Sequence, residues 1–211
     1  MAIAERELTV PTQSAKEQQS IEADWMPPPY RWTVEQFCQA GESGVFEGHR
    51  VMLIEGEILA MPAMNPPHQS GVSLTAEALR VAFGEGFFVR EQAAFSVNQA
   101  TDPEPDAAVI AGSIRDFLSR HPTKAALVVE VSNSTLSFDR HDKASLYAKA
   151  GIEECWIVNV KGAQVEVHRQ PEPDEAQPHG FGYRLKTIHQ GGEIIQPLAA
   201  PKPVAVSLLL P

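Results

Sequence analysis

The chain has 211 residues, 43% of which are hydrophobic, and its formal net charge at pH 7 is −10. This composition is typical of a globular protein with a substantial core, and it excludes a wholly disordered chain. No apolar run approaches the roughly 20 residues that a membrane-spanning helix needs. The charged N-terminal start also lacks the apolar stretch of a signal peptide, so we expect a cytoplasmic protein. The acidic net charge disfavours a protein that coats nucleic acid through a broad basic surface.

The N-terminal half begins with a polar segment without hydrophobic periodicity, residues 1–29, which we expect to be a flexible tail. A capping box made by Thr33 and Gln36 then begins a helix. Two short β-prone runs flank the turn at 55–56 and predict a hairpin. The elements expected in this half are a helix at 33–41, strands at 51–54 and 57–61, a proline-rich loop at 62–67, a helix at 68–83, strand structure within 87–97 and a strand at 107–111.

The C-terminal half contains a continuous apolar strand at 125–132, of the kind that is buried on both faces of a sheet. Ser137 can cap the helix that follows, and Gly151 stands where a C-terminal glycine belongs. Residues 170–181 are rich in Pro, Asp, Glu and Gly, and we interpret them as a linker or long loop. The other elements expected in this half are a short helix after Ser113, a helix at 138–150, a hairpin of strands at 155–160 and 164–169, and strand-like pieces within 183–211.

Two carboxylates stand at strand positions where they can converge. Glu130 lies within the apolar strand, where a bare charge is costly unless it is paired or bound to a metal. Asp106 follows Pro105 and opens the strand at 107–111. Alone, Glu130 is also compatible with a solvent-exposed strand end, and Asp106 with a turn-forming residue. Together, in neighbouring strands and with the backbone carbonyl of Val131, they would supply the oxygen ligands that Mg²⁺ or Mn²⁺ prefers.

The helix after Glu130 carries a third charged group. Asp139, Lys143 and Tyr147 are spaced at i, i+4 and i+8, so they form one stripe along the helix. This spacing is also that of an ordinary surface ion pair. If the helix packs back onto the sheet, however, the Lys143 ammonium points at the two carboxylates, and we expect Tyr147 to pack and Asp139 to cap or pair. A bound divalent cation and a lysine are groups suited to phosphodiester hydrolysis.

The order of several sequence words resembles the Uma-two family of restriction endonucleases, within the PD-(D/E)XK nuclease superfamily. Ser132 stands where the superfamily pattern carries its lysine, and Lys143 fits the variation in which that lysine lies on the next helix. The words run in the family's order over about residues 30–170: Leu53–Ile58, Met61 with Pro62 and His68, Pro105 with Asp106, Val128–Ser132, Asp139 with Lys143 and Tyr147, and Ala150–Val158.

The resemblance implies an α/β fold with a restriction-endonuclease-like core, a mixed central sheet flanked by helices, and β-hairpin additions. It divides the chain into the tail, a nuclease-like domain at 30–170 and a C-terminal extension with short strands at 171–211. It also implies that Asp106 and Glu130 bind the metal and that Lys143 assists catalysis. Glu57 and His68 occupy positions where the family carries a polar pair, although Glu57 is equally compatible with an exposed hairpin residue and His68 with a helix N-terminal residue.

The function expected from these residues is a metal-dependent DNA endonuclease. The alternative is a catalytically inactive binding or structural module on the nuclease fold, because function depends on the site and not on the fold. The acidic charge and the lack of a helix-turn-helix, zinc or basic-tail signal favour the module, or an enzyme that grips DNA as a homodimer.

Overall fold

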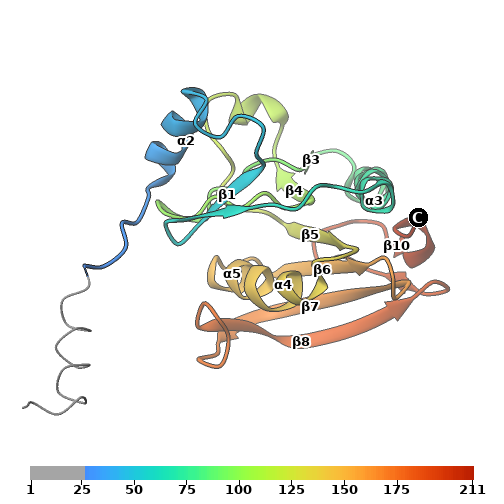
Figure 1. The fold of residues 1–211 in the computed structure, drawn as a ribbon. Helices are drawn as coiled ribbons and strands as arrows, with labels where there is room; N and C mark the ends of the chain where they lie inside the picture. Colours follow the sequence, from blue (N-terminus) through green and yellow to red (C-terminus); the bar gives the residue numbers. More distant parts are fainter. Residues whose placement is uncertain (1–26) are drawn as a thin grey trace, which may run out of the picture. The chain divides into compact units, whose positions relative to one another are not determined.

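The computed structural model describes residues 27–211, so the predicted flexible tail lies almost entirely outside the described residues. Within them, Arg31–Pro211 forms one compact unit built on a six-stranded mixed sheet with the order β3-β4-β5-β6-β7-β8 (Figure 1). The strands are β3 (Phe87–Glu91), β4 (Ala107–Ala111), β5 (Leu127–Ser132), β6 (Glu154–Asn159), β7 (Gln164–Pro173) and β8 (Phe181–Gln190). The predicted α/β class with a mixed central sheet is confirmed.

Strand β5 is at the centre of this arrangement. It pairs antiparallel with β4 and parallel with β6, and all six of its residues are buried. Its apolar side chains alternate between two cores, as the period of a strand requires. Val129 and Val131 face the core that contains Leu79, whereas Val128 faces the core that contains Tyr147. A carboxylate on this strand therefore has no route to bulk water except at the strand's end.

One helix covers each face of β5. Helix α3 (Pro66–Phe83) supplies Leu79 to the first core. On the other face, α4 (Leu136–Phe138), a π-helical turn at Asp139–Lys143 and α5 (Ala144–Lys149) run on without a break. The connection from β5 through this helix to the parallel strand β6 is the βαβ arrangement that a parallel pair needs.

A hairpin of β1 (Val51–Ile54) and β2 (Glu57–Ala60) lies outside the central sheet, as predicted. It is tied to the loop before β4 by a hydrogen bond from the Asp102 N–H to the Leu53 carbonyl, 2.8 Å. The capping box of Thr33 and Gln36 is also confirmed, at the start of α2 (Val34–Glu42). The remaining short elements are the 3₁₀ turns Ile114–Phe117 and Val206–Leu208 and the strand pair β9 (Ile194–Ile195) and β10 (Val204–Ala205).

Three local predictions are wrong. Residues 170–181 are not a linker, and the loop is confined to 174–180, because β7 runs on to Pro173 and β8, which extends the central sheet, begins at Phe181. The helix before β6 begins at Leu136 and not after Ser137. The predicted proline loop is shorter, since Pro66 and Pro67 form the first turn of α3, where a missing N–H costs nothing.

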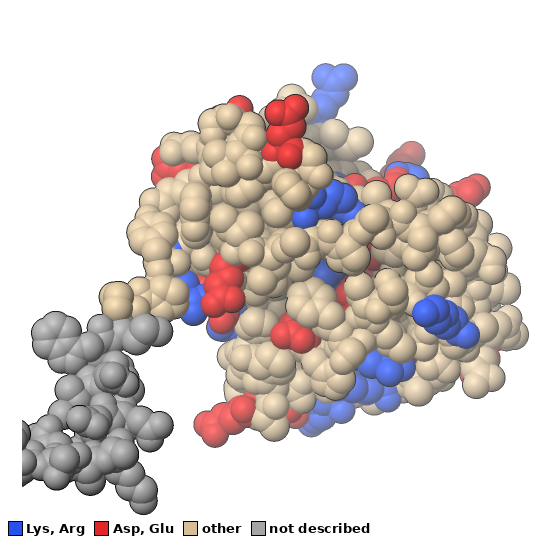
Figure 2. All heavy atoms as spheres, viewed as in Figure 1, with Lys and Arg blue, Asp and Glu red and all other residues tan. Residues whose placement is uncertain are grey.

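On the face drawn in Figure 2, Lys and Arg side chains form separate small patches among acidic and uncharged residues. Among the described residues, no helix has the length and apolar character needed to cross a membrane.

The packing of α3 on β5 generates a stability prediction. A Cβ added to Gly71 of α3 would lie 2.7 Å from Val131 Cγ1, which is closer than two carbon atoms approach. We expect Gly71→Ala to lower the free energy of unfolding by about 1–2 kcal/mol, because overpacking exceeds the gain in helix propensity. Urea unfolding would measure the change.

Gly191 provides the matched control, because a Cβ there would meet nothing within 4 Å and its φ lies outside the left-handed region. We expect Gly191→Ala to leave stability within about 0.5 kcal/mol of the wild-type value. A Gly71→Ala protein as stable as this control would contradict the close approach of α3 to β5.

Candidate active site

Asp106 and Glu130 lie at the joint between β4 and β5. The antiparallel register pairs Ala107 with Val129, so the next pair along the strands is Asp106 with Glu130. Asp106 Oδ2 accepts a hydrogen bond from the Val131 N–H, 2.8 Å, which fixes the start of β4 against β5. The expectation that these two strands are neighbours is confirmed.

Glu130 is 1% exposed and makes two hydrogen bonds to the helix that covers it. Its Oε2 accepts from Lys143 Nζ at 2.8 Å, and its Oε1 accepts from the Tyr147 hydroxyl at 2.6 Å. Burial raises the pKa of Glu130 above its usual value, and the nearby Lys143 ammonium opposes this and favours the charged carboxylate. A carboxylate at the centre of the core is therefore held by one cation and one neutral donor.

Lys143 is held between carboxylates. Besides the contact with Glu130, its ammonium lies 3.8 Å from Asp139 Oδ1, and Asp139 Oδ2 accepts a hydrogen bond from the Thr135 hydroxyl, 2.6 Å. Burial alone would lower the pKa of Lys143, but the carboxylates of Glu130, Asp139 and Asp106 outweigh it and raise the pKa above its usual value. Lys143 is thus a permanent positive charge in this cluster.

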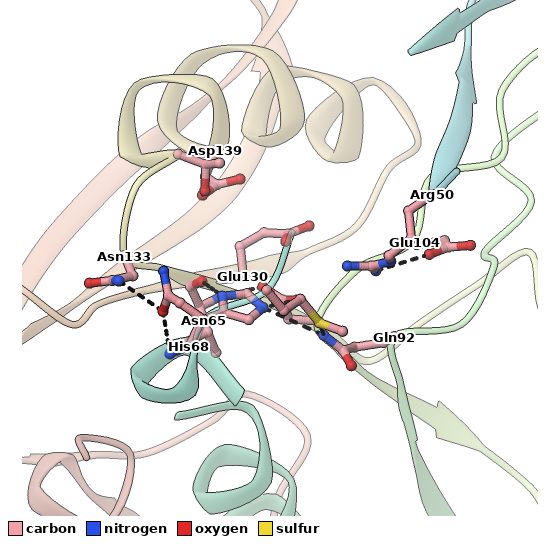
Figure 3. Close-up of polar contacts among 12 residues, drawn as sticks. Arg50, Asn65, His68, Gln92, Glu104, Glu130, Asn133 and Asp139 are labelled. Atoms are coloured by element: carbon pink, nitrogen blue, oxygen red, sulfur yellow. Dashed lines mark hydrogen bonds and ion pairs between the residues drawn. The ribbon is translucent and has the colours of Figure 1, made fainter. Parts of the chain in front are cut away.

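His68 joins the cluster from the first turn of α3, which Asn65 caps by accepting the His68 N–H, 3.2 Å (Figure 3). Its Nδ1 lies 2.7 Å from the Val131 carbonyl oxygen, and its Nε2 lies 3.1 Å from Asp106 Oδ1. Both neighbours are acceptors, and this geometry favours the doubly protonated ring, the imidazolium. The hydrogen bond to Asp106 raises the pKa of His68 accordingly.

A pocket of about 350 Å³ opens beside these residues. Its polar lining includes His68, Asp106, Asp139 and Lys143. The β1–β2 hairpin, the segment after it and Phe138 supply apolar walls. The arrangement is that of a ligand site, with apolar walls and a few convergent polar groups.

Two residues of this region were not predicted from the sequence. The Gln92 amide lies 3.5 Å from His68 Nε2, and Gln92 has a φ of +45°, an unusual value for a residue other than glycine. Arg50 lines the pocket and pairs with Glu104 at 3.4 Å. Their position depends on the folding of distant loops, and neither stands in a motif that could have indicated it.

Glu57 is the one predicted site residue that the structure does not bring to this cluster. Its carboxylate pairs with Arg31 at 2.5 Å and is about half exposed, and it does not line the pocket. Its role in the site stays a prediction from the resemblance alone.

Comparison with known proteins supports the reading of the fold. A family model, Uma2, described as "Putative restriction endonuclease", matches residues 34–207. The chain is also similar to the crystal structure of a "putative nuclease belonging to DUF820" from Anabaena variabilis ATCC 29413, at 13% sequence identity and a TM-score of 0.62. That similarity covers 84% of this chain and 97% of the other, and at this identity it shows the fold alone. No curated protein matches the chain significantly.

The buried ion pair generates a second stability prediction. We expect Lys143→Met to lower the free energy of unfolding by about 3–5 kcal/mol, because Glu130 then stays buried without its cation. The double variant K143M/E130Q removes both charges and keeps an acceptor for Tyr147, so we expect it to recover most of the loss. Urea unfolding of the single and double variants would measure the coupling.

Lys149→Met is the control, since this lysine forms an exposed ion pair with Glu55, in which the two side chains are 40% and 44% exposed. Its loss should cost less than about 1 kcal/mol. If the effects of the Lys143 and Glu130 exchanges simply add, the two side chains are not coupled as described.

Proposed function

Since this chain belongs to the Uma2 family, we propose that it hydrolyses phosphodiester bonds of DNA as a metal-dependent endonuclease. The observation that carries the proposal is the cluster of Asp106, Glu130 and Lys143 beside a pocket, with two neighbouring strands and one helix supplying the three side chains. The homodimer and the cytoplasmic location expected from the sequence stay predictions.

The donor atoms fit a divalent cation in their chemistry. Among the described residues, no group of three His, Cys, Asp or Glu side chains is placed to hold a metal ion. The set we propose therefore combines two carboxylates, Asp106 and Glu130, with the backbone carbonyl of Val131. Asp106 Oδ1 and the Val131 oxygen already point at one cationic group, the His68 ring, at 3.1 and 2.7 Å. Hard oxygen donors of this kind suit Mg²⁺ or Mn²⁺.

When bound, such a cation would activate water and neutralise charge on the phosphate. The side chains of the protein supply the other contributions to catalysis. Lys143 carries a positive charge that Glu130 and Asp139 hold in place, where it stabilises negative charge developing on the phosphate oxygens. His68 contacts the Asp106 carboxylate and the Val131 carbonyl from the first turn of α3. Tyr147 orients Glu130 from the core.

The proposed ligands can be tested by binding alone. We expect the wild-type protein to bind Mn²⁺, and Asp106→Asn to weaken binding at least about tenfold, because a neutral amide is a poorer ligand for a hard cation than a carboxylate. Isothermal titration with Mn²⁺ would measure the affinity. Glu77→Gln, an exposed exchange on the same helix as His68, is the control and should bind like the wild type. Equal affinity for all three proteins would remove Asp106 from the ligand set.

Activity is the direct test of the function. We expect Mg²⁺- or Mn²⁺-dependent cleavage of DNA by the wild type, and a loss of about a hundredfold or more in Asp106→Asn and Glu130→Gln. Cleavage of labelled DNA substrates, followed on denaturing gels, would measure the rates. Glu77→Gln should cut at the wild-type rate, and Glu57→Ala and His68→Ala would decide whether those residues contribute. A folded wild-type protein that binds no Mn²⁺ and cuts no DNA would establish the inactive-module alternative.

A further inference from the structure

We propose that the pocket takes one unpaired nucleotide of a DNA strand, so that the preferred substrate is single-stranded or locally unpaired DNA and not an intact duplex. The inference deepens the proposed function and rests on it. It follows from how far the polar cluster lies below the surface, from the apolar pocket walls, and from the distribution of charge.

The proposed catalytic groups are recessed. The side chain of His68 is 17% exposed, that of Asp106 12% and that of Lys143 6%. They line a pocket of about 350 Å³, a volume suited to one small ligand. In a duplex, each nucleotide is stacked between its neighbours and paired across the helix. Seating a whole nucleotide in the pocket requires that it leave the stack, which costs a few kcal/mol in a duplex and much less in an unpaired strand.

The walls have the chemistry of a base-binding surface. Three of the chain's five methionines line the pocket, Met52, Met61 and Met64, together with the ring of Phe138. Thioethers and aromatic rings contact the faces of nucleobases favourably, with little preference among the bases. A site that only tracked the phosphates of a duplex would need cations in place of these side chains.

Arg50 adds a charged group to the apolar side of the pocket. The side chain of Arg50 is 33% exposed, and its guanidinium makes one long contact, 3.4 Å, with Glu104. Figure 3 shows this pair on the strand side of the site, across from Asp139. A guanidinium there suits the phosphate next to the bound nucleotide.

The face drawn in Figure 2 lacks the continuous basic surface that suits a duplex. The net charge is −10, and the basic side chains on the face drawn in Figure 2 form separate patches and no continuous band. Binding that depends on stacking in one pocket needs fewer phosphate contacts than binding along a duplex. The net charge and the pocket lining therefore both favour single-stranded or locally unpaired DNA as the substrate.

The test is binding without added metal, in EDTA, so that no cleavage occurs. Fluorescence anisotropy would compare a short single-stranded DNA of mixed sequence, its duplex, and the same duplex with one unpaired nucleotide. We expect the single strand and the interrupted duplex to bind at least about tenfold more tightly than the intact duplex. Phe138→Ala should weaken single-strand binding about tenfold, the usual effect of losing one aromatic stack, and Phe138→Trp should retain it.

Phe46→Ala is the matched control, because Phe46 is also a partly buried ring but packs on Phe37 and lies outside the pocket lining. Phe138 also packs near Met52, so thermal unfolding of each variant would establish that it is folded. Arg50→Gln is the second variant and should weaken single-strand binding with a shallower salt dependence. Intact duplex bound as tightly as the single strand, or single-strand binding that folded Phe138→Ala and Arg50→Gln leave unchanged, would overturn the inference.

The proposed nuclease function and the proposed preference for unpaired DNA can be disproved independently. If the protein cleaves intact duplex, requires Asp106 to do so and shows no preference for single strands, the nuclease function is supported and only the proposed substrate preference is disproved. If the protein binds single strands preferentially through Phe138 but cuts no DNA, the proposed nucleotide pocket is supported and the nuclease function is disproved.

Discussion

A carboxylate buried in the middle strand of a sheet imposes a requirement on everything around it. Glu130 is 1% exposed, in a strand whose other residues pack into two apolar cores. Without a partner its charge would cost several kcal/mol. Lys143 and Tyr147 meet this requirement from one helix, at 2.8 and 2.6 Å. The rotation and depth of that helix on the sheet are thereby fixed, and the polar wall of the pocket with them.

The same strand organises the opposite face through its backbone. The N–H and carbonyl of Val131 contact Asp106 and His68, while its side chain meets Gly71 of α3. Because α3 can approach so closely only at a glycine, the helix brings its first turn, and His68 with it, to the end of β5. Packing on one side and ion pairing on the other therefore converge on one strand end, where the pocket lies.

The sequence was most informative where a charged residue stood in or beside an apolar strand. A glutamate in an apolar run and an aspartate at a strand start predicted neighbouring strands, and the i, i+4, i+8 stripe predicted which helix face would meet them. Contacts within loops were out of reach, since the left-handed backbone of Gln92 and the position of Arg50 depend on tertiary packing. The β7–β8 hairpin was missed because its turn is rich in Pro and charged residues, which sheet pairing overrides.

The residues that contact one another around the pocket are separated by very different lengths of chain, and these lengths affect the entropy cost of forming each contact. Lys143 and Glu130 are 13 residues apart, whereas His68 and the carbonyl of Val131 are 63 residues apart. Closing a longer loop costs more entropy, and contacts distant in sequence slow folding. The ion pair lies within a local βαβ unit, whereas the histidine contact also requires α3 to pack on the sheet. The contact that neutralises the buried charge therefore has a smaller loop-closure cost than the contact that completes the binding site.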